Sequence, residues 1–268
     1  HLTGLDRGIM RDGLGAVQRV LLLGGASEIG LATVKELAKS GRLRHVYLAV
    51  RSVESGDAAQ RELASLYPSL TITPLLFDAA DQSTFEPMLN KAFSEGEIDC
   101  VISAFGLLGN DVAPLADVAG VNRLLQVNYV AAVITGTQVV QRFQSQGSGT
   151  LVVLSSVAAE RSRFDNYVYA STKAGVDSWA SGLADALKGS GIDVIVVRPG
   201  FVHTKMTTGL PVAPLATTPD QVAVVIVEAI KTRKPLVWAP KTVRPLMSTL
   251  RHLPRPVFQA VTKKAGNG

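Results

Sequence analysis

The sequence predicts an α/β fold in which one domain contains a doubly wound parallel sheet of about seven strands, followed by a C-terminal helical extension. Short apolar runs alternate with helix-length segments along the chain, which is the pattern of such a sheet. The runs are almost continuously apolar, as expected when helices cover both faces of the sheet. The length of 268 residues and the hydrophobic content of 47% suit one domain with a sizeable core.

The strand-like runs lie at residues 19–23, 45–50, 70–77, 99–104, 150–154, 193–197 and 236–238. Amphipathic stretches between and after them predict helices at 29–40, 57–66, 81–93, 121–144 and 166–188. No repeat, low-complexity linker or composition shift marks a second domain. We expect the folded domain to span 16–240, with a basic amphipathic extension at 241–268. Residues 1–15 are expected to be a flexible N-terminus or added sequence.

The composition limits the partners. Lys and Arg number 27 against 22 Asp and Glu, a net charge of +5 that favours phosphate groups or an anionic membrane surface and also fits an ordinary basic protein. No nucleic-acid motif is present, so no nucleic-acid partner is expected. The lone Cys100 is expected to be a buried thiol, and no metal site is expected. Neither a secretory signal nor a membrane-spanning run is visible, which favours a cytoplasmic location or the membrane periphery of the cell envelope.

A glycine-rich turn follows the first predicted strand, and it reads Gly24-Gly25-Ala26-Ser27-Glu28-Ile29-Gly30. Backbone N–H groups at such a helix start attract a diphosphate, and glycines allow it to approach closely. The turn therefore predicts a Rossmann-type site for a dinucleotide, NAD(H) or NADP(H), although a plain tight turn is the alternative. The expected contacts here are Gly25, Ser27, Glu28, Ile29 and Gly30.

Further cofactor contacts are expected where other strands end. Open α/β sheets bind ligands at the carboxyl ends of their strands. The third strand is followed by Asp78 and Ala79, where a carboxylate would accept a hydrogen bond from adenine. The residues expected after the fourth and sixth strands are Ala104, Phe105, Gly106, Pro199, Gly200, Val202 and Thr204.

The choice between NADH and NADPH stays open. The second strand ends in Arg51 where an acidic residue would repel a 2′-phosphate, so charge mildly favours NADPH. A solvated arginine with no ligand is an equal alternative. Glu28 opposes this preference if its charge lies near the same phosphate.

Four residues form the candidate catalytic set. Tyr169 and Lys173 are spaced i, i+4, which places them on one helical face, and an ammonium there would lower the pKa of the phenol. Ser156 follows the fifth strand, where its hydroxyl would bind a substrate carbonyl. Asn128 lies in an apolar helical pattern, and a buried amide there needs a partner such as a backbone carbonyl or a water. His203 is a weaker candidate, expected only to be exposed.

Together these motifs resemble the short-chain dehydrogenase/reductase superfamily over nearly the whole chain. The resemblance implies that Tyr169 donates a proton, and that Lys173 tunes it and binds the nicotinamide ribose. It also implies that Ser156 polarises the carbonyl and that Asn128 organises a water-linked proton path. The chain departs from the family at the glycine turn, which is one residue short, and at Ser103-Ala104-Phe105-Gly106, where Asn-Asn-Ala-Gly is usual. The two longest helices are candidates for pairing in a homo-oligomer, as is common in the superfamily.

These departures, with Leu236-Val237-Trp238-Ala239-Pro240 and 250–255, resemble one branch of the superfamily. It is the decaprenylphosphoryl-2-keto-β-D-erythro-pentose reductases of mycobacteria and their relatives. The branch implies a polyprenyl-phosphate sugar substrate, arabinan synthesis for the cell wall and a flavin-dependent oxidase partner. It is associated with NADH, which conflicts with the charge of Arg51. A soluble reductase of another ketone or acyl carbonyl and a non-catalytic nucleotide sensor are the alternatives.

The extension mixes apolar residues with cations, as in segments that lie at an anionic membrane interface. Packing of this segment on the domain or on a second subunit is an equal alternative. Pro245, Pro254 and Pro256 are expected to interrupt any single long helix there.

Overall fold

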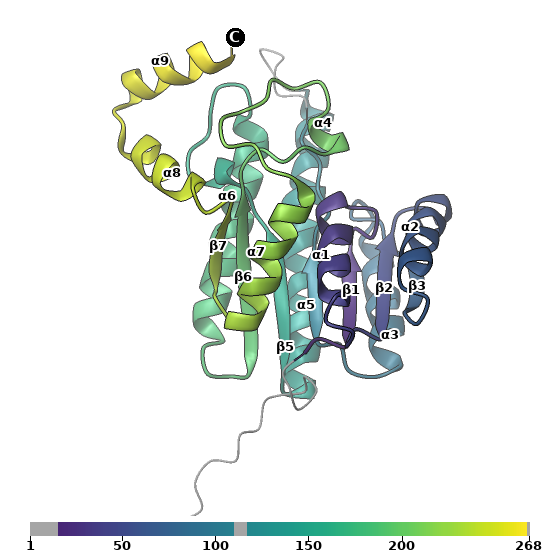
Figure 1. The fold of residues 1–268 in the computed structure, drawn as a ribbon. Coiled ribbons are helices and arrows are strands. Elements are labelled where there is room, and N and C mark those ends of the chain that lie inside the picture. Colours follow the sequence, from purple (N-terminus) through teal and green to yellow (C-terminus); the bar gives the residue numbers. More distant parts are fainter. Residues whose placement is uncertain (1–15, 110–116, 267–268) are drawn as a thin grey trace, which may run out of the picture.

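The computed structural model describes residues 16–109 and 117–266, so the expected N-terminal segment 1–15 lies outside the described residues. The described chain forms a seven-stranded, wholly parallel sheet in the order β3-β2-β1-β4-β5-β6-β7, which confirms the predicted fold class (Figure 1). The strands are β1 (Arg19–Leu23), β2 (His45–Val50), β3 (Thr71–Leu76), β4 (Cys100–Ser103), β5 (Gly149–Leu154), β6 (Ile192–Pro199) and β7 (Leu236–Ala239).

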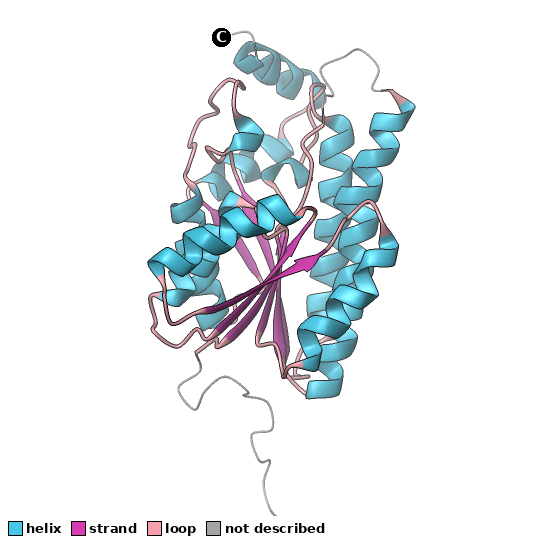
Figure 2. Cartoon of the chain, turned by 90° about the vertical axis from the view of Figure 1, so that its right-hand side faces the viewer, coloured by secondary structure: helices cyan, strands magenta, loops and turns pink. Residues whose placement is uncertain are grey.

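The helices are α1 (Glu28–Ala38), α2 (Val53–Leu66), α3 (Phe85–Ser94), α4 (Val118–Leu125), α5 (Ala131–Gln146), α6 (Tyr167–Ala186), α7 (Pro219–Thr232), α8 (Val243–His252) and α9 (Arg255–Gly266). Helices cover both faces of the sheet, as Figure 2 shows from the side. Leu21 and Leu22 are adjacent in β1, point to opposite faces and are both fully buried. This two-sided burial explains why the strands are continuously apolar in the sequence.

Two apolar cores lie on the two faces. Leu22 belongs to the core that contains residues of α1, α2 and α7, and Leu21 to the one that contains residues of α3, α5 and α6. Cys100 is fully buried in the first core, as expected. No helix in the described part of the chain is long and apolar enough to cross a membrane.

The helix expected at 121–144 is not regular. The described backbone runs as α4, then a π-helical turn over Gln126–Val130, then α5. Such a turn inserts one extra residue per helical turn and is often found at functional sites. The buried Asn128 lies at its centre.

The C-terminal extension forms two helices, α8 and α9, that lie beyond β7 near the carboxyl edge of the sheet (Figure 1). The break at Leu253 and Pro254 agrees with the expected interruption, because proline removes a backbone donor and clashes with the preceding turn. Pro245 and Pro256 are instead accommodated near the starts of the two helices, where backbone donors have no helical partner.

Candidate active site

Tyr169 and Lys173 lie on α6, one turn apart, and face the end of β5. The Lys173 Nζ donates a hydrogen bond of 2.9 Å to the carbonyl of Leu154, the last residue of β5, and lies 5.9 Å from the centre of the Tyr169 ring. The Tyr169 and Ser156 side chains are hydrogen-bonded, and the Ser156 Oγ also accepts a bond of 3.1 Å from the Ala158 N–H. A serine hydroxyl, a phenol and an amine therefore meet at one point of the sheet edge.

Burial dominates the electrostatics of this group. It raises the pKa of the Tyr169 phenol above its usual value, and the hydrogen bond to Ser156 opposes that rise. This differs from the expectation that the Lys173 ammonium would lower this pKa, because Lys173 is turned to the Leu154 carbonyl. Burial lowers the pKa of Lys173 to about 8, so this amine is still mostly protonated at pH 7.

Asn128 holds the turn that follows β4. Its Oδ1 accepts a hydrogen bond of 2.7 Å from the Leu107 N–H, and its Nδ2 donates one of 2.8 Å to the Leu107 carbonyl. Nδ2 is also 3.3 Å from the Thr172 Oγ1, next to Lys173 on α6. The amide thus binds both backbone groups of one residue, where a single carbonyl or a water was expected.

Gly106 lies directly beside these side chains. A Cβ on Gly106 would be 3.4 Å from the Asn128 Oδ1 and 3.7 Å from the Lys173 Nζ. These are ordinary van der Waals distances, so they place Gly106 in direct contact with the two side chains. The structure therefore brings together Asn128, Ser156, Tyr169 and Lys173 with the Ala104-Phe105-Gly106 turn.

The glycine turn joins β1 to α1 as expected. Ser27 is the N-cap of α1, and its Oγ accepts a hydrogen bond of 3.2 Å from the Gly30 N–H. Gly24 has φ of +86°, and a Cβ there would lie 2.8 Å from the Phe105 backbone nitrogen. At Gly25 and Gly30 an added Cβ would collide with side chains of β2 and β1. The start of α1, with Glu28 and Ile29 in its first turn, is thus held close to the sheet edge, which fits the diphosphate of a dinucleotide.

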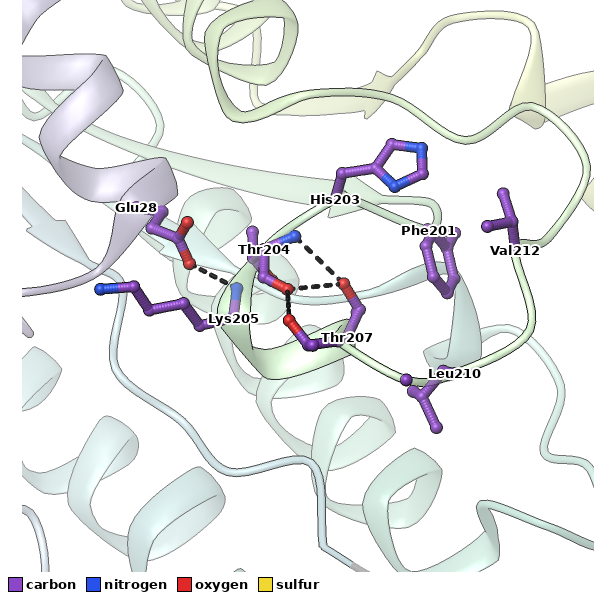
Figure 3. A pocket seen from close by; sticks show the side chains of 10 residues that line it. Glu28, Phe201, His203, Thr204, Lys205, Thr207, Leu210 and Val212 are labelled. Atoms are coloured by element: carbon purple, nitrogen blue, oxygen red, sulfur yellow. Dashed lines mark hydrogen bonds between the residues drawn. The ribbon is translucent and has the colours of Figure 1, made fainter.

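Glu28 contacts the loop after β6. Its Oε2 accepts a hydrogen bond of 2.7 Å from the Lys205 N–H, so the carboxylate is turned toward that loop (Figure 3). The effect of its charge on a phosphate at Arg51 stays a prediction. Arg51 is exposed at the end of β2.

The loop after β6 borders a cavity of about 430 Å³ with the start of α1. Thr204 is the N-cap of a 3₁₀ turn at Lys205–Thr207, and its N–H donates a hydrogen bond of 3.1 Å to the Thr207 Oγ1. His203 is exposed, lines the cavity and packs edge-on against Phe201 (Figure 3). Val202 is buried and bridges to Thr217. Pro199 ends β6, and the N–H of the following Gly200 donates a hydrogen bond of 2.9 Å to the Ala239 carbonyl.

Asp78 and Ala79 follow β3 and lie apart from the catalytic group, at the far end of the sheet order. The Asp78 Oδ1 accepts a hydrogen bond of 2.9 Å from the Ala80 N–H, which fixes the carboxylate in the loop. Ala79 is buried. The expected cofactor residues therefore follow the sheet edge from β3 to β6, as an extended dinucleotide requires.

The family model described as short chain dehydrogenase matches residues 18–213, which include the glycine turn and all four candidate catalytic residues. The chain belongs to this family. It is accordingly an oxidoreductase, as the resemblance implied.

Two uncharacterized bacterial oxidoreductases are similar over almost the full chain. An uncharacterized oxidoreductase of Streptomyces coelicolor is 40% identical over 251 residues, which cover 93% of this chain and 98% of the relative. An uncharacterized oxidoreductase of Mycobacterium tuberculosis is 36% identical over 247 residues, which cover 91% of this chain and 97% of the relative. A short-chain dehydrogenase from Sphingobium yanoikuyae, solved in complex with NADPH, has a TM-score of 0.75 at 21% identity. The match covers 89% of this chain and 97% of that structure. This last similarity concerns the fold.

One polar network in this short-chain dehydrogenase was not anticipated. Asp177 lies one turn beyond Lys173 on the same face of α6 and accepts hydrogen bonds from the Ser155 Oγ at 2.7 Å and from Arg198 at 2.6 and 2.8 Å. Arg198 also pairs with Glu160. The i, i+4, i+8 spacing of Tyr169, Lys173 and Asp177 was visible in the sequence, but their partners were not. Within the described residues, no group of three or more His, Cys, Asp or Glu side chains could hold a metal ion.

Proposed function

We propose that this oxidoreductase reduces the 2-keto group of a lipid-linked pentose, decaprenylphosphoryl-2-keto-erythro-pentose, to the corresponding arabinose lipid. The observation that supports reduction of a ketone is the hydrogen-bonded pair of Tyr169 and Ser156 beside the buried Lys173. A bound NADH or NADPH supplies the hydride. The glycine turn before α1 and the turns after β3, β4 and β6 would contact this cofactor.

The chain's own groups divide the remaining work. The Tyr169 phenol donates a proton to the carbonyl oxygen, and what supports this role is its position in hydrogen-bond contact with Ser156 at the end of β5. The Ser156 hydroxyl binds the same oxygen. The Lys173 amine, held by the Leu154 carbonyl, would bind the nicotinamide ribose, and Asn128 fixes the turn that carries Gly106.

The charge at the end of β2 affects the choice between NADH and NADPH. Arg51 is exposed there, and Glu28 is occupied by the Lys205 N–H. The exposed cation favours NADPH, whereas the branch resemblance favours NADH and the charge of Glu28 opposes NADPH if it lies near the same phosphate. Comparison of the two dissociation constants for the unaltered chain and for Arg51→Gln tests this point. Loss of affinity for NADPH alone would support a 2′-phosphate contact.

The loop after β6 favours an apolar substrate. Four of its large hydrophobic side chains are between 42% and 64% exposed, namely Met206, Leu210, Val212 and Leu215. Leu210 and Val212 line the cavity with Phe201 (Figure 3). Exposed apolar groups in one short loop are typical of an interaction with an apolar ligand. A polyprenyl chain has this chemistry, and its phosphate would seek the cations nearby.

The extension suits the delivery of such a lipid. Leu246, Val257 and Val261 are between 39% and 47% exposed on α8 and α9, and Arg244 and Arg255 of the same helices are exposed. Lys263 and Lys264, also expected to contribute, have side chains outside the described set. Exposed apolar and basic groups in one segment favour contact with an anionic bilayer. A flavin-dependent oxidase that forms the ketone is the partner that this reaction needs.

Competition between a lipid-linked and a lipid-free substrate tests the proposal. We expect a kcat/KM for the decaprenyl substrate at least ~100-fold above that for the same keto-pentose phosphate without its lipid, because several isoprene units would be buried. Equal values would instead favour the alternative, a reductase of a small ketone. No cofactor oxidation with either, despite cofactor binding, would favour a nucleotide sensor.

A further inference from the structure

Residues 157–166 form the loop between the two catalytic hydroxyls. Ser156 precedes this loop, and Tyr169 follows it in the first turn of α6. The hydrogen bond between these two side chains therefore depends on where the loop is held. The N-cap of α6, Asn166, makes no side-chain capping bond, so the start of the helix is not fixed by its own cap.

Arg161 connects this loop to the C-terminal extension. Its Nη1 donates hydrogen bonds of 2.7 Å to the carbonyls of Leu250 and Leu253, and one of 3.2 Å to that of Arg251. These carbonyls belong to the last turn of α8 and the residue after it, where helix carbonyls lack helical partners and carry partial negative charge. The Arg161 guanidinium also lies 3.9 Å from the centre of the Phe258 ring of α9, and Phe258 is 6% exposed.

Glu160 makes a second connection between the loop and its neighbours, to Arg198 of β6 and to Arg251 of α8. Its Oε1 binds Arg198, whose guanidinium is also held by Asp177 on the helix of Tyr169. Its Oε2 accepts a hydrogen bond of 3.2 Å from Arg251 of α8. Only 8% of the Glu160 side chain is exposed, so its charge needs both cations. The loop is thus bonded on one side to α6 and β6 and on the other to α8.

We infer that Arg161 is a positioning residue that couples α8 and α9 to the active site. By holding loop 157–166 against the extension, it keeps Ser156 at hydrogen-bond distance from Tyr169. The extension is then a structural part of the reductase site as well as a surface for lipid. This inference rests on the proposed proton-donor role of Tyr169, but not on the identity of the lipid substrate.

Arg161→Met is the variant that tests the coupling. Methionine keeps an apolar stem against Phe258 and removes every donor to the three carbonyls. Leu250 and Leu253 are half-buried and Arg251 is exposed, so water can reach the freed carbonyls and folding should survive. Arg163→Met is the matched control, because Arg163 lies in the same loop and its side chain pairs with the loop residue Asp165. Arg161→Lys restores one charged donor.

Amide hydrogen exchange of residues 157–166 gives a readout without substrate or cofactor. We expect exchange at least ~10-fold faster in Arg161→Met, unchanged exchange in Arg163→Met and partial recovery in Arg161→Lys. The inference is overturned if exchange is unchanged in Arg161→Met, or if it accelerates equally in Arg163→Met. A failure of the lipid substrate would not affect this measurement.

Kinetics separate positioning from a purely structural role. With decaprenylphosphoryl-2-keto-pentose, we expect Arg161→Met to lower kcat about 10-fold at an unchanged cofactor dissociation constant, the effect of a misplaced hydroxyl. The primary deuterium isotope effect on kcat should rise, because the chemical step becomes slower. A lower kcat with an unchanged isotope effect would indicate fewer folded molecules and would count against the inference. If the unaltered chain does not turn over this lipid, the substrate proposal fails and the exchange result alone decides on Arg161.

Discussion

Tyr169, Lys173 and Asp177 lie on successive turns of one face of α6, and the structure gives each a different partner. Tyr169 is bonded to Ser156, Lys173 to the Leu154 carbonyl, and Asp177 to Ser155 and Arg198. All three contacts reach the end of β5 or the adjacent β6. The helix therefore presents a phenol, an amine and a carboxylate to the same part of the sheet edge.

Tyr169→Phe removes the hydroxyl that we propose as the proton donor and keeps the aromatic ring. We expect cofactor affinity to stay within about twofold while kcat falls by at least ~100-fold, since general acid catalysis contributes on that scale. Steady-state kinetics and fluorescence titration with the cofactor measure the two quantities. Turnover at the original rate would show that another group donates the proton.

Lys173 should make stability depend on pH in a defined window. Burial lowers its pKa from 10.5 to about 8 in the folded chain. The unfolded chain therefore binds more protons between these values, and the stability that this residue contributes rises with pH there. Below pH 8 the amine is charged in both states, and its desolvation cost is fully present.

Lys173→Met removes this titration. Relative to the variant, the unaltered chain should gain up to about 3 kcal/mol of unfolding free energy between pH 7 and pH 10. Urea unfolding of both proteins across this range measures the difference, with Lys91→Met on the exposed face of α3 as control. Parallel stability curves for the unaltered chain and Lys173→Met would contradict the assignment of burial as the cause.

At the scale of elements, two short irregular segments set the positions of the site residues. The π-helical turn Gln126–Val130 contains Asn128, which clamps Leu107 through both of its backbone groups. The glycine turn presses the start of α1 against β2 and the Phe105 backbone. Regular helices and strands carry the other site residues to the same edge.

Gly24→Ala tests the packing of the glycine turn. Gly24 and Gly41 both have positive φ, +86° and +67°, where an alanine costs about 1 kcal/mol. At Gly24 the added Cβ would also meet the Phe105 backbone at 2.8 Å, whereas nothing lies within 4 Å at Gly41. We expect Gly24→Ala to lower the unfolding free energy by about 1–3 kcal/mol more than Gly41→Ala. Equal losses in urea unfolding would show that the turn is not tightly packed.

The strands could be predicted from the sequence because burial on both faces of the sheet leaves continuous apolar runs, and the run at 19–23 coincides with β1. The π-helical turn could not be predicted, because one inserted residue hardly changes an apolar pattern. Local spacing suggested Tyr169 with Lys173. The bonds from Arg161 to Leu250 and Leu253 join residues 89 and 92 positions apart, and only the fold brings them together. The contact of Glu28 with the Lys205 N–H was not predicted for the same reason.

At the scale of the whole molecule, the carboxyl edge of the sheet carries the reactive groups, and the apolar loop after β6 and the C-terminal helices lie at the same edge (Figures 1 and 3). The extension is docked by Phe258 and Arg161 while Val257 and Val261 stay about half exposed. Of the two expectations for this segment, packing on the domain describes the face with Phe258, and contact with a membrane stays a prediction for the face with Val257 and Val261.

Vesicle flotation tests the outward face. We expect the unaltered chain to float with vesicles rich in anionic phospholipid, and Val257→Ser with Val261→Ser to weaken binding about 10-fold, since two partly buried side chains would be lost. Val224→Ser on α7 is the control, because Val224 is 52% exposed on another helix. Flotation that is absent, or equal in all three proteins, would remove the membrane from the proposal.

The central claim is that the Tyr169 site reduces a lipid-linked keto-pentose. It is tested most directly by oxidation of NADH and NADPH, measured in parallel, on decaprenylphosphoryl-2-keto-erythro-pentose with the unaltered chain and with Tyr169→Phe. We predict one cofactor oxidised for each arabinose lipid formed, with at least one of the two cofactors, and a rate lowered at least ~100-fold in the variant. Cofactor that binds but is not oxidised in the presence of this lipid, or product formed at equal rates by both proteins, would contradict the claim.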